Sequence, residues 1–414
     1  MTIPDPQTWA ADVRAWLQGA AGTAAAASRS PDLAVFRNLS DEQETDLLAA
    51  IRHYRRARYD AGYGALTLPV EHGGGGLPAS FAVLFSQLEA SFAVPPSTEL
   101  ISVTTGLVAP ALALYGSPEL RERFLTPLLR TDLLACQLFS EPGAGSDLAA
   151  VACRAVRDDG PDGAPDWVLD GQKVWSSGAR HADLGLLLAR TDPTVPKHAG
   201  ITAFLVQLDL PGLTVRPIRQ MSGGSSFNEV FLDQVRIPDS FRVGEVGQGW
   251  AVATATLAFE RQASGTGTRR KGGSFDDLLA LAQAQGLSAD PVVRQQLADL
   301  YVRSVLKAWT AQRVARAAAA GVSPGPAGSV GKLVAADLLV RTGELAADLL
   351  GHQILADHGD GTFAWTEHLL GAPGYRLAGG TDQIQRNVIA ERVLGLPAEP
   401  RVDKDVPFAD LPKG

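Results

Sequence analysis

Serine and glycine are concentrated in FSEPGAGSDLA, residues 139–149, in a pattern that suits the binding of a phosphate-bearing or planar cofactor. Gly143 and Gly145 have no side chain, so the backbone there can approach a ligand closely. Ser140 and Ser146 add hydroxyl groups and N–H donors. Such a nest of donors suits phosphate oxygens or the ring atoms of a flavin. A ligand-free Gly-rich turn has a similar sequence, so the neighbouring motifs must decide between the two.

Two further segments carry groups that could contact the same cofactor. GQKVWSSG places Trp175 and Ser177 at the edge of a predicted strand, although an ordinary core tryptophan is the alternative. YRLAGGTDQIQR, residues 375–386, combines paired glycines with Thr381 and Gln383.

These three segments, in this order around a β-rich middle, closely resemble the acyl-CoA dehydrogenase family. The resemblance covers nearly the whole chain, from AGYGALTLPVEHGGGG to ERVLGLP. It implies an α+β fold with an N-terminal helical domain, a middle β-barrel or sandwich domain and a C-terminal four-helix bundle, usually assembled as a tetramer. It also implies FAD, which loops of this fold would bind, because no Rossmann-type GxGxxG follows a predicted strand.

The resemblance assigns FAD contacts to individual residues of this chain. The residues expected to line the flavin are Phe139, Ser140, Gly145 and Ser146. Trp175 and Ser177 are expected to cover its other face. Thr381 and Gln383 match the positions that contact the FAD of a neighbouring subunit.

One family feature is missing after the first C-terminal helix. The family commonly carries an Arg-x-x-Phe-Gly pattern there, whose arginine contacts the pyrophosphate of the neighbouring FAD. This chain has RRKGGSFDD in that region. Arg269 and Arg270 are both candidates for the contact, and the sequence leaves the choice open.

The catalytic base is the second departure from the common family pattern. Acyl-CoA dehydrogenation needs a carboxylate over the substrate α-carbon, and many members place a glutamate directly before the Gly-Thr of the C-terminal loop. Gly379 occupies that position and cannot accept a proton. A second branch of the family carries its glutamate on the first C-terminal helix, directly before an arginine. Glu260 and Arg261 in ATLAFERQASG match that branch.

We therefore predict that Glu260 is the base and that Arg261 orients it or balances its charge. Desolvation on this mostly apolar helix tends to raise a carboxyl pKa towards a useful range. The alternative is a structural ion pair between the two residues. Gly379 retains its N–H, which is expected to donate to the thioester oxygen.

Two other glutamates are assigned structural roles. Glu391 precedes an arginine on the last helix, more than two turns beyond the glycine pair. Glu141, in SEPG, is expected to hold its loop in place.

The composition excludes several classes of protein. A formal net charge of −8 argues against nucleic-acid binding. Cys136 and Cys153 are too few for a disulfide framework or a zinc site and are expected to be core residues. The histidines show no metal-ligand pattern, so no metal is predicted. No apolar run approaches the length of a membrane span and no signal peptide is evident, which predicts a cytoplasmic protein.

The elements that must position the site fall into three blocks. Helical periodicity dominates residues 1–133, with Ser40 and Gln43 as a capping box. Short runs rich in β-branched residues follow in 134–246 and predict an antiparallel β unit. Helical periodicity returns in 247–414. A ligand crevice is expected where the blocks meet.

The predicted function is FAD-dependent α,β-dehydrogenation of an acyl thioester, carried by CoA or an acyl carrier protein. The resemblance also implies an electron-transfer flavoprotein as acceptor, and a homo-oligomer (dimer or tetramer) or a heteromer with a related subunit. One alternative is a flavin monooxygenase or oxidase on the same fold. The other is a non-catalytic subunit that completes the FAD site of another chain.

Overall fold

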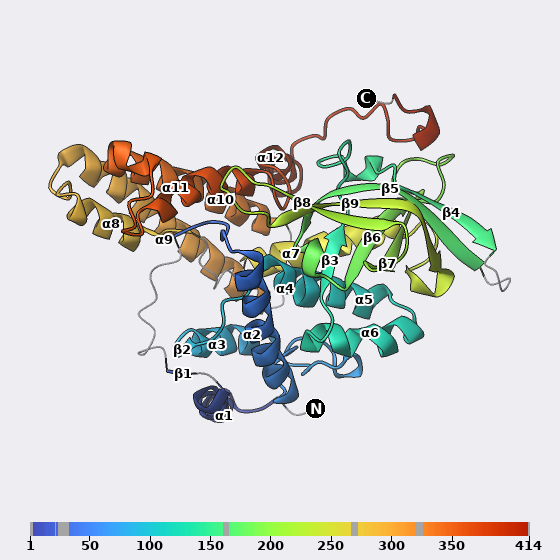
Figure 1. The fold of residues 1–414 in the computed structure, drawn as a ribbon, viewed down its shortest axis with the longest axis horizontal. Coiled ribbons are helices and arrows are strands. Elements are labelled where there is room, and N and C mark those ends of the chain that lie inside the picture. Colours follow the sequence, from blue (N-terminus) through green and yellow to red (C-terminus); the bar gives the residue numbers. More distant parts are fainter. Residues whose placement is uncertain are drawn as a thin grey trace.

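The order of elements along the chain is helices, then a sheet, then helices, as the sequence predicts (Figure 1). The structure is a computed structural model that describes residues 3–20, 22–23, 33–159, 165–265, 272–319 and 326–412.

The helices of the first block lie below the sheet in Figure 1, with α4 to α6 near it and α1 to α3 farther away. They are α1 (Pro6–Ala20), α2 (Asp41–Asp60), α3 (Ala79–Glu89), α4 (Glu99–Val103), α5 (Ala109–Tyr115) and α6 (Pro118–Arg130). The predicted capping box starts α2, because the Ser40 hydroxyl accepts from the Gln43 N–H and the Gln43 side chain accepts from the Ser40 N–H. A short ladder joins β1 (Gly22–Thr23) to β2 (Phe92–Ala93).

An eight-stranded sheet forms the middle of the molecule. Its hydrogen-bonded order is β10-β7-β6-β4-β5-β9-β8, with β3 paired to β6. The strands are β3 (Ala135–Leu138), β4 (Arg154–Asp159), β5 (Pro165–Ser177), β6 (Leu184–Arg190), β7 (Ile201–Gln207), β8 (Leu213–Ile218), β9 (Phe227–Pro238) and β10 (Arg242–Val243).

The sheet is mixed, and the prediction of a purely antiparallel unit was wrong in this respect. β3 runs parallel to β6, and β4 meets β6 in parallel at Arg154 and Arg190. Parallel neighbours need a long connection between them. The chain between β3 and β6 contains β4, β5 and the Gly-rich segment, so it is long enough to return in the same direction. Local spacing does not reveal such a pairing.

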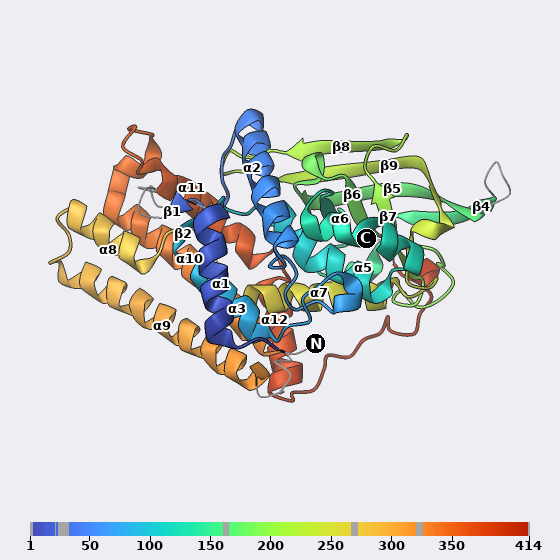
Figure 2. The ribbon, with the colours of Figure 1, turned by 90° about the horizontal axis from the view of Figure 1, so that it is seen from below.

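Most helices of the last block, α8 to α11, extend to the end of the molecule away from the sheet, whereas α7 lies beside α5 and the sheet (Figure 2). They are α7 (Gly249–Gly265), α8 (Phe275–Ala284), α9 (Pro291–Ala319), α10 (Ala327–Leu350), α11 (Phe363–Gly371) and α12 (Asp382–Val388). α10 packs against each of the other five. α7 also packs on β7 and α5, so it links this bundle to the sheet and to the first block.

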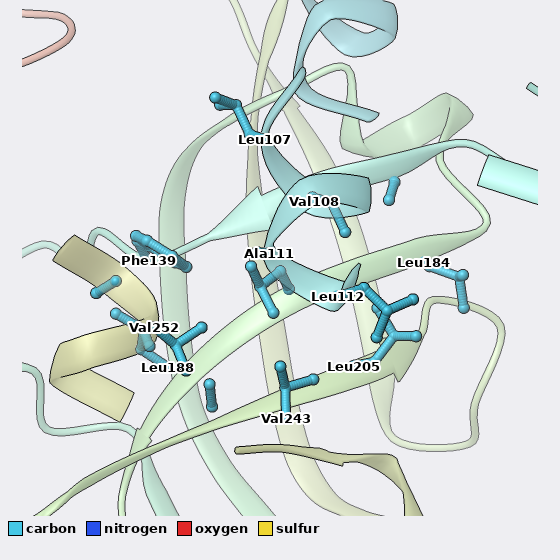
Figure 3. Close-up of a cluster of buried hydrophobic side chains, with 14 of the residues drawn as sticks. Leu107, Val108, Ala111, Leu112, Phe139, Leu184, Leu188, Leu205, Val243 and Val252 are labelled. Carbon is cyan, nitrogen blue, oxygen red and sulfur yellow. The ribbon is translucent and has the colours of Figure 1, made fainter. Parts of the chain in front are cut away.

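One hydrophobic core contains residues from all three blocks (Figure 3). Leu112 of α5, Leu188 of β6 and Val252 of α7 are almost completely buried in it. Burial of apolar surface stabilises the folded state by about 25 cal/mol per Å². This shared core therefore holds the helix that carries Glu260 at a fixed position relative to the sheet.

Phe204 tests the packing inside the sheet. Its side chain is fully buried and meets the edge of Trp167 at a ring-centroid distance of 5.4 Å. We expect Phe204→Ala to lower the free energy of unfolding by about 3–5 kcal/mol, measured by chemical denaturation, because it leaves a cavity. Val156→Ala removes an exposed side chain from β4 and is the control, with an expected change within about 0.5 kcal/mol. Equal effects of the two substitutions would contradict this packing.

Candidate active site

A buried ion pair holds the segment 139–149, which we call the flavin loop. The Lys173 Nζ lies 2.6 Å from the Glu141 Oε1, and neither side chain is appreciably exposed. Lys173 also donates to the Phe139 carbonyl at 3.1 Å. The Glu141 carboxylate accepts from the backbone N–H groups of Ala152 at 2.7 Å and Cys153 at 3.0 Å. These bonds confirm the loop-fixing role predicted for Glu141.

Backbone bonds complete the shape of the flavin loop. Glu141 and Ala144 exchange N–H···O bonds of 3.1 and 3.0 Å, and the Val174 N–H donates to the Ser140 carbonyl at 2.9 Å. A Cβ built on Gly143 or Gly145 meets no atom within 4 Å. The loop therefore presents glycine backbone to open space, where a flat ligand can approach it closely.

The other predicted members of this loop differ in exposure. Ser146 is exposed and Ser140 is half-buried, so both hydroxyls lie near the surface. Phe139 instead packs its ring in the shared core beside Leu188 and Val252 (Figure 3). The packed ring leaves only the backbone of Phe139 for the predicted flavin contact, which stays a prediction.

Trp175 has an unusual conformation at the end of β5. Its φ is +62°, and its side chain is 59% exposed. The register with β9 shifts between Lys173 and Ser176, which marks a bulge that redirects the indole. The Trp175 and Phe227 rings meet edge to face with their centroids 6.0 Å apart, and much of the indole surface stays exposed. Ser177, half-buried, pairs with Phe227 across the ladder.

The glycine pair and helix α12 form the third part of the candidate site. Gly379 and Gly380 have φ values of +64° and +83°, a region that favours glycine. The Gln385 Nε2 donates to the Gly379 carbonyl at 2.8 Å and closes the turn. Thr381 caps α12, because its hydroxyl accepts from the Ile384 N–H at 3.2 Å. Gln383 is exposed on the first turn of this helix.

The predicted base lies on α7. Glu260 lies four residues after the buried Thr256 of this helix. The side chains of Glu260 and Arg261 lie outside the described part of the structure, and so do Arg269 and Arg270.

Family matches cover nearly all of this architecture. Residues 36–132, 136–235 and 247–394 match the N-terminal, middle and C-terminal domains of acyl-CoA dehydrogenase. The chain belongs to the acyl-CoA dehydrogenase family.

Individual relatives agree with this membership. Acyl-CoA dehydrogenase FadE34 of Mycobacterium tuberculosis is 40% identical over 357 residues, which are 84% of this chain and 47% of the relative, so the chain spans about half of that protein. Acyl-CoA dehydrogenase IpdE1 of Mycolicibacterium smegmatis is 36% identical over 95% of this chain and 98% of its own length. The solved structure named Tcur3481-Tcur3483 steroid ACAD has a TM-score of 0.75 and 25% identity, over 96% of this chain and all of its own.

Enzymes of this family are flavoprotein oxidoreductases, and their cofactor is FAD. The described residues fit that cofactor, because open glycine backbone and an exposed indole face are what an isoalloxazine ring needs. The groups that organise these surfaces, Lys173 above all, were missed by sequence reasoning. The available signal was the position of Lys173 in the alternation of β5, where it follows Trp167 and Leu169, which are both buried, on every second residue.

Neither a metal site nor a membrane span emerges from the part of the chain that is described. There, His, Cys, Asp and Glu form no group of three that could hold a metal ion. No described helix combines the length and apolar character needed to cross a bilayer. Cys136 and Cys153 are both free and buried, as predicted.

Lys173→Met tests the ion pair that fixes the flavin loop. The substitution leaves the Glu141 carboxylate buried without its cation, which we expect to lower the free energy of unfolding by about 3–5 kcal/mol. Denaturant unfolding of the flavin-free protein measures this. Arg154→Met is the matched control, because Arg154 is largely exposed and its pair with Asp170, at 3.6 Å, is expected to contribute about 0–1 kcal/mol. A cost no larger than that of the control would show that the pair does not hold the loop.

Trp175→Ala tests the exposed indole as a surface for the cofactor. We expect FAD affinity to fall about tenfold, because stacking on an aromatic ring contributes about 0.5–1.5 kcal/mol beyond burial. Titration of FAD into flavin-free protein measures the affinity. The melting temperature of the flavin-free protein should change little, since the side chain is mostly exposed. Trp175→Phe should restore most of the affinity, and no loss in Trp175→Ala would remove Trp175 from the site.

Proposed function

We propose that this protein dehydrogenates an acyl thioester between its α- and β-carbons and releases the 2-enoyl product. The observation that carries the proposal is that a glutamate is absent from one family position for the catalytic base and present at the other. Gly379 has no side chain where many relatives carry their base, while Glu260 stands on the helix where a branch of the family carries it. FAD, when bound, accepts the hydride that leaves the β-carbon.

In this proposal Glu260 removes the α-proton of the substrate. Its helix is held against the sheet by Val252 and the shared core, which supports a fixed approach to the substrate. Arg261, the next residue, orients Glu260 or balances its charge.

The thioester oxygen gains negative charge as the α-proton leaves, so it needs hydrogen-bond donors. We assign one of them to the backbone N–H of Gly379. The Gln385 side chain holds the Gly379 carbonyl, which supports a fixed orientation of this turn. A glycine pair also adds little bulk, and this suits a branched or polycyclic acyl group.

The substrate class follows from that space and from the names of the relatives. The Tcur3481-Tcur3483 structure is named a steroid ACAD, which supports a bulky acyl group of the steroid type here. The proposed carrier is CoA, with an acyl carrier protein as the alternative.

Partners form a further part of the proposal. We propose an electron-transfer flavoprotein as the electron acceptor, and either a homo-oligomer or a heteromer with a related subunit. The paired names of the steroid ACAD support the heteromer. Thr381 and Gln383 would then serve the FAD of the neighbouring subunit. The predicted cytoplasmic location also stays a proposal, which fractionation of producing cells tests.

Two other functions predict different behaviour of the purified protein. An oxidase or monooxygenase would let oxygen reoxidise the reduced flavin rapidly, with peroxide or a hydroxylated product. A non-catalytic subunit would purify without flavin and gain none alone. Relatives with the oxidase activity usually lack the carboxylate base, so Glu260 favours the dehydrogenase.

Glu260→Gln tests the base directly. The variant keeps the size of the side chain but cannot take a proton, so we expect acyl-CoA to reduce the flavin about 10²–10⁴-fold more slowly. Anaerobic stopped-flow mixing with a panel of acyl-CoAs, including steroid side-chain thioesters, measures bleaching of the flavin band.

Glu391→Gln is the matched control, because Glu391 belongs to the other Glu-Arg pair and is exposed on the turn after α12. It should leave the rate unchanged. If Glu260→Gln bleaches as fast as the wild type, Glu260 is not the base.

A further inference from the structure

Residues 397–412, which we call the strap, leave the helical bundle and cross to the sheet (Figure 1). There they lie on the connection between β6 and β7, residues 191–200, which we call the docking loop. Pro407 forms a bridge with Pro196. The Phe408 N–H donates to the Val195 carbonyl at 2.9 Å, and the next N–H donates to the Pro193 carbonyl at 2.8 Å. No part of the proposed chemistry uses this contact.

Two buried cations lie beneath the strap, and both are tied to the flavin loop or its end. Arg190 donates to the carbonyls of Ala149 at 2.6 Å and Val151 at 3.0 Å, and also to that of Lys197 at 2.5 Å. The Lys197 Nζ bonds the carboxylate of Asp147, a flavin-loop residue, at 2.7 Å. Each cationic residue is only 4% exposed. The docking loop and the flavin loop are therefore one connected unit.

The strap completes the surroundings of both cations. The Phe408 ring covers the Arg190 guanidinium at 3.9 Å, and the Asp403 carboxylate lies 2.5 Å from the Lys197 Nζ. A buried charge is costly unless it is paired, and a cation over an aromatic face is stabilised. Burial lowers the pKa of Arg190 to about 10, so it remains charged at neutral pH. Without the strap, Arg190 loses the aromatic ring that covers it, and Lys197 loses one of its two carboxylate partners.

The docking loop also reaches the helix of the predicted base. His198 meets the edge of Trp250, the second residue of α7, at 4.6 Å. Ile201, just beyond the docking loop, leaves no room for a side chain at Gly249, where a Cβ would lie 2.7 Å from its carbonyl carbon. Strap, docking loop, flavin loop and α7 thus form a continuous chain of contacts.

We infer that the strap positions the flavin loop for FAD, with Phe408 and Asp403 as positioning residues that act through Arg190 and Lys197. This inference rests on the proposal that residues 139–149 bind FAD. The strap contacts neither the reacting atoms nor, in this assignment, the cofactor itself.

Amide hydrogen exchange of residues 139–153 in the flavin-free protein tests the inference without relying on FAD. We expect exchange in this segment to become at least about tenfold faster when residues 397–412 are deleted and in Phe408→Ala, because local opening then costs less. Phe408→Tyr keeps an aromatic face over Arg190 and should restore slow exchange. Val402→Ala is the matched control within the strap, since Val402 is 93% exposed.

FAD titration of these variants and of Asp403→Asn supplies the second readout. Affinity should fall at least about tenfold in Phe408→Ala and in Asp403→Asn, and remain unchanged in Val402→Ala. Unchanged exchange at 139–153 in Phe408→Ala overturns the inference, and so does faster exchange with unchanged FAD affinity. Failure of the flavin assignment is distinguishable, because FAD would then not slow exchange of residues 139–149 in the wild type.

Discussion

The candidate site depends on a lysine and a glutamate that are buried together under the flavin loop. Lys173 and Glu141 are 32 positions apart, and their contact joins the loop to β5. Removing two charges from water is costly, so the pair persists only because each member also bonds backbone groups. An apolar pair could stabilise a core equally well, but it could not satisfy the N–H groups of Ala152 and Cys153. The pair therefore specifies a loop shape more than it adds stability.

Lys173 fixes both surfaces proposed for the flavin, the flavin loop and the Trp175 indole. Lys173 stands two positions before Trp175 on β5, and the bulge between them turns the indole outward. The bonds that shape the flavin loop and the strand that presents Trp175 thus meet at one residue. A change at Lys173 would alter both surfaces together, whereas changes at Ser146 or Ser177 alter one.

Local sequence patterns predicted the helices and strands well, but they could not predict which distant residues or strands pair. β5 to β9 were predicted because β-branched runs and turn residues mark each strand, and the capping box of α2 lies within four residues. The parallel pairing of β3 with β6 depends on the whole fold. Lys173 could be singled out because it continues the alternation of the buried Trp167 and Leu169 along β5, but its partner could not be named from the sequence. The strap gave no signal, because VDKDVPFADLP mixes charged, apolar and proline residues as many loops do.

The bridge between Pro196 and Pro407 joins positions more than 200 residues apart, so it imposes an order on folding during synthesis. The sheet and the flavin loop leave the ribosome long before Phe408 does, and domains generally fold as they emerge. Until then Arg190 lacks Phe408, Lys197 lacks Asp403, and the flavin loop bonded to these two cations is only partly fixed. Cofactor capture at the flavin loop would then be deferred until Phe408 has emerged, by which time the helices from α7 to α12 have also left the ribosome.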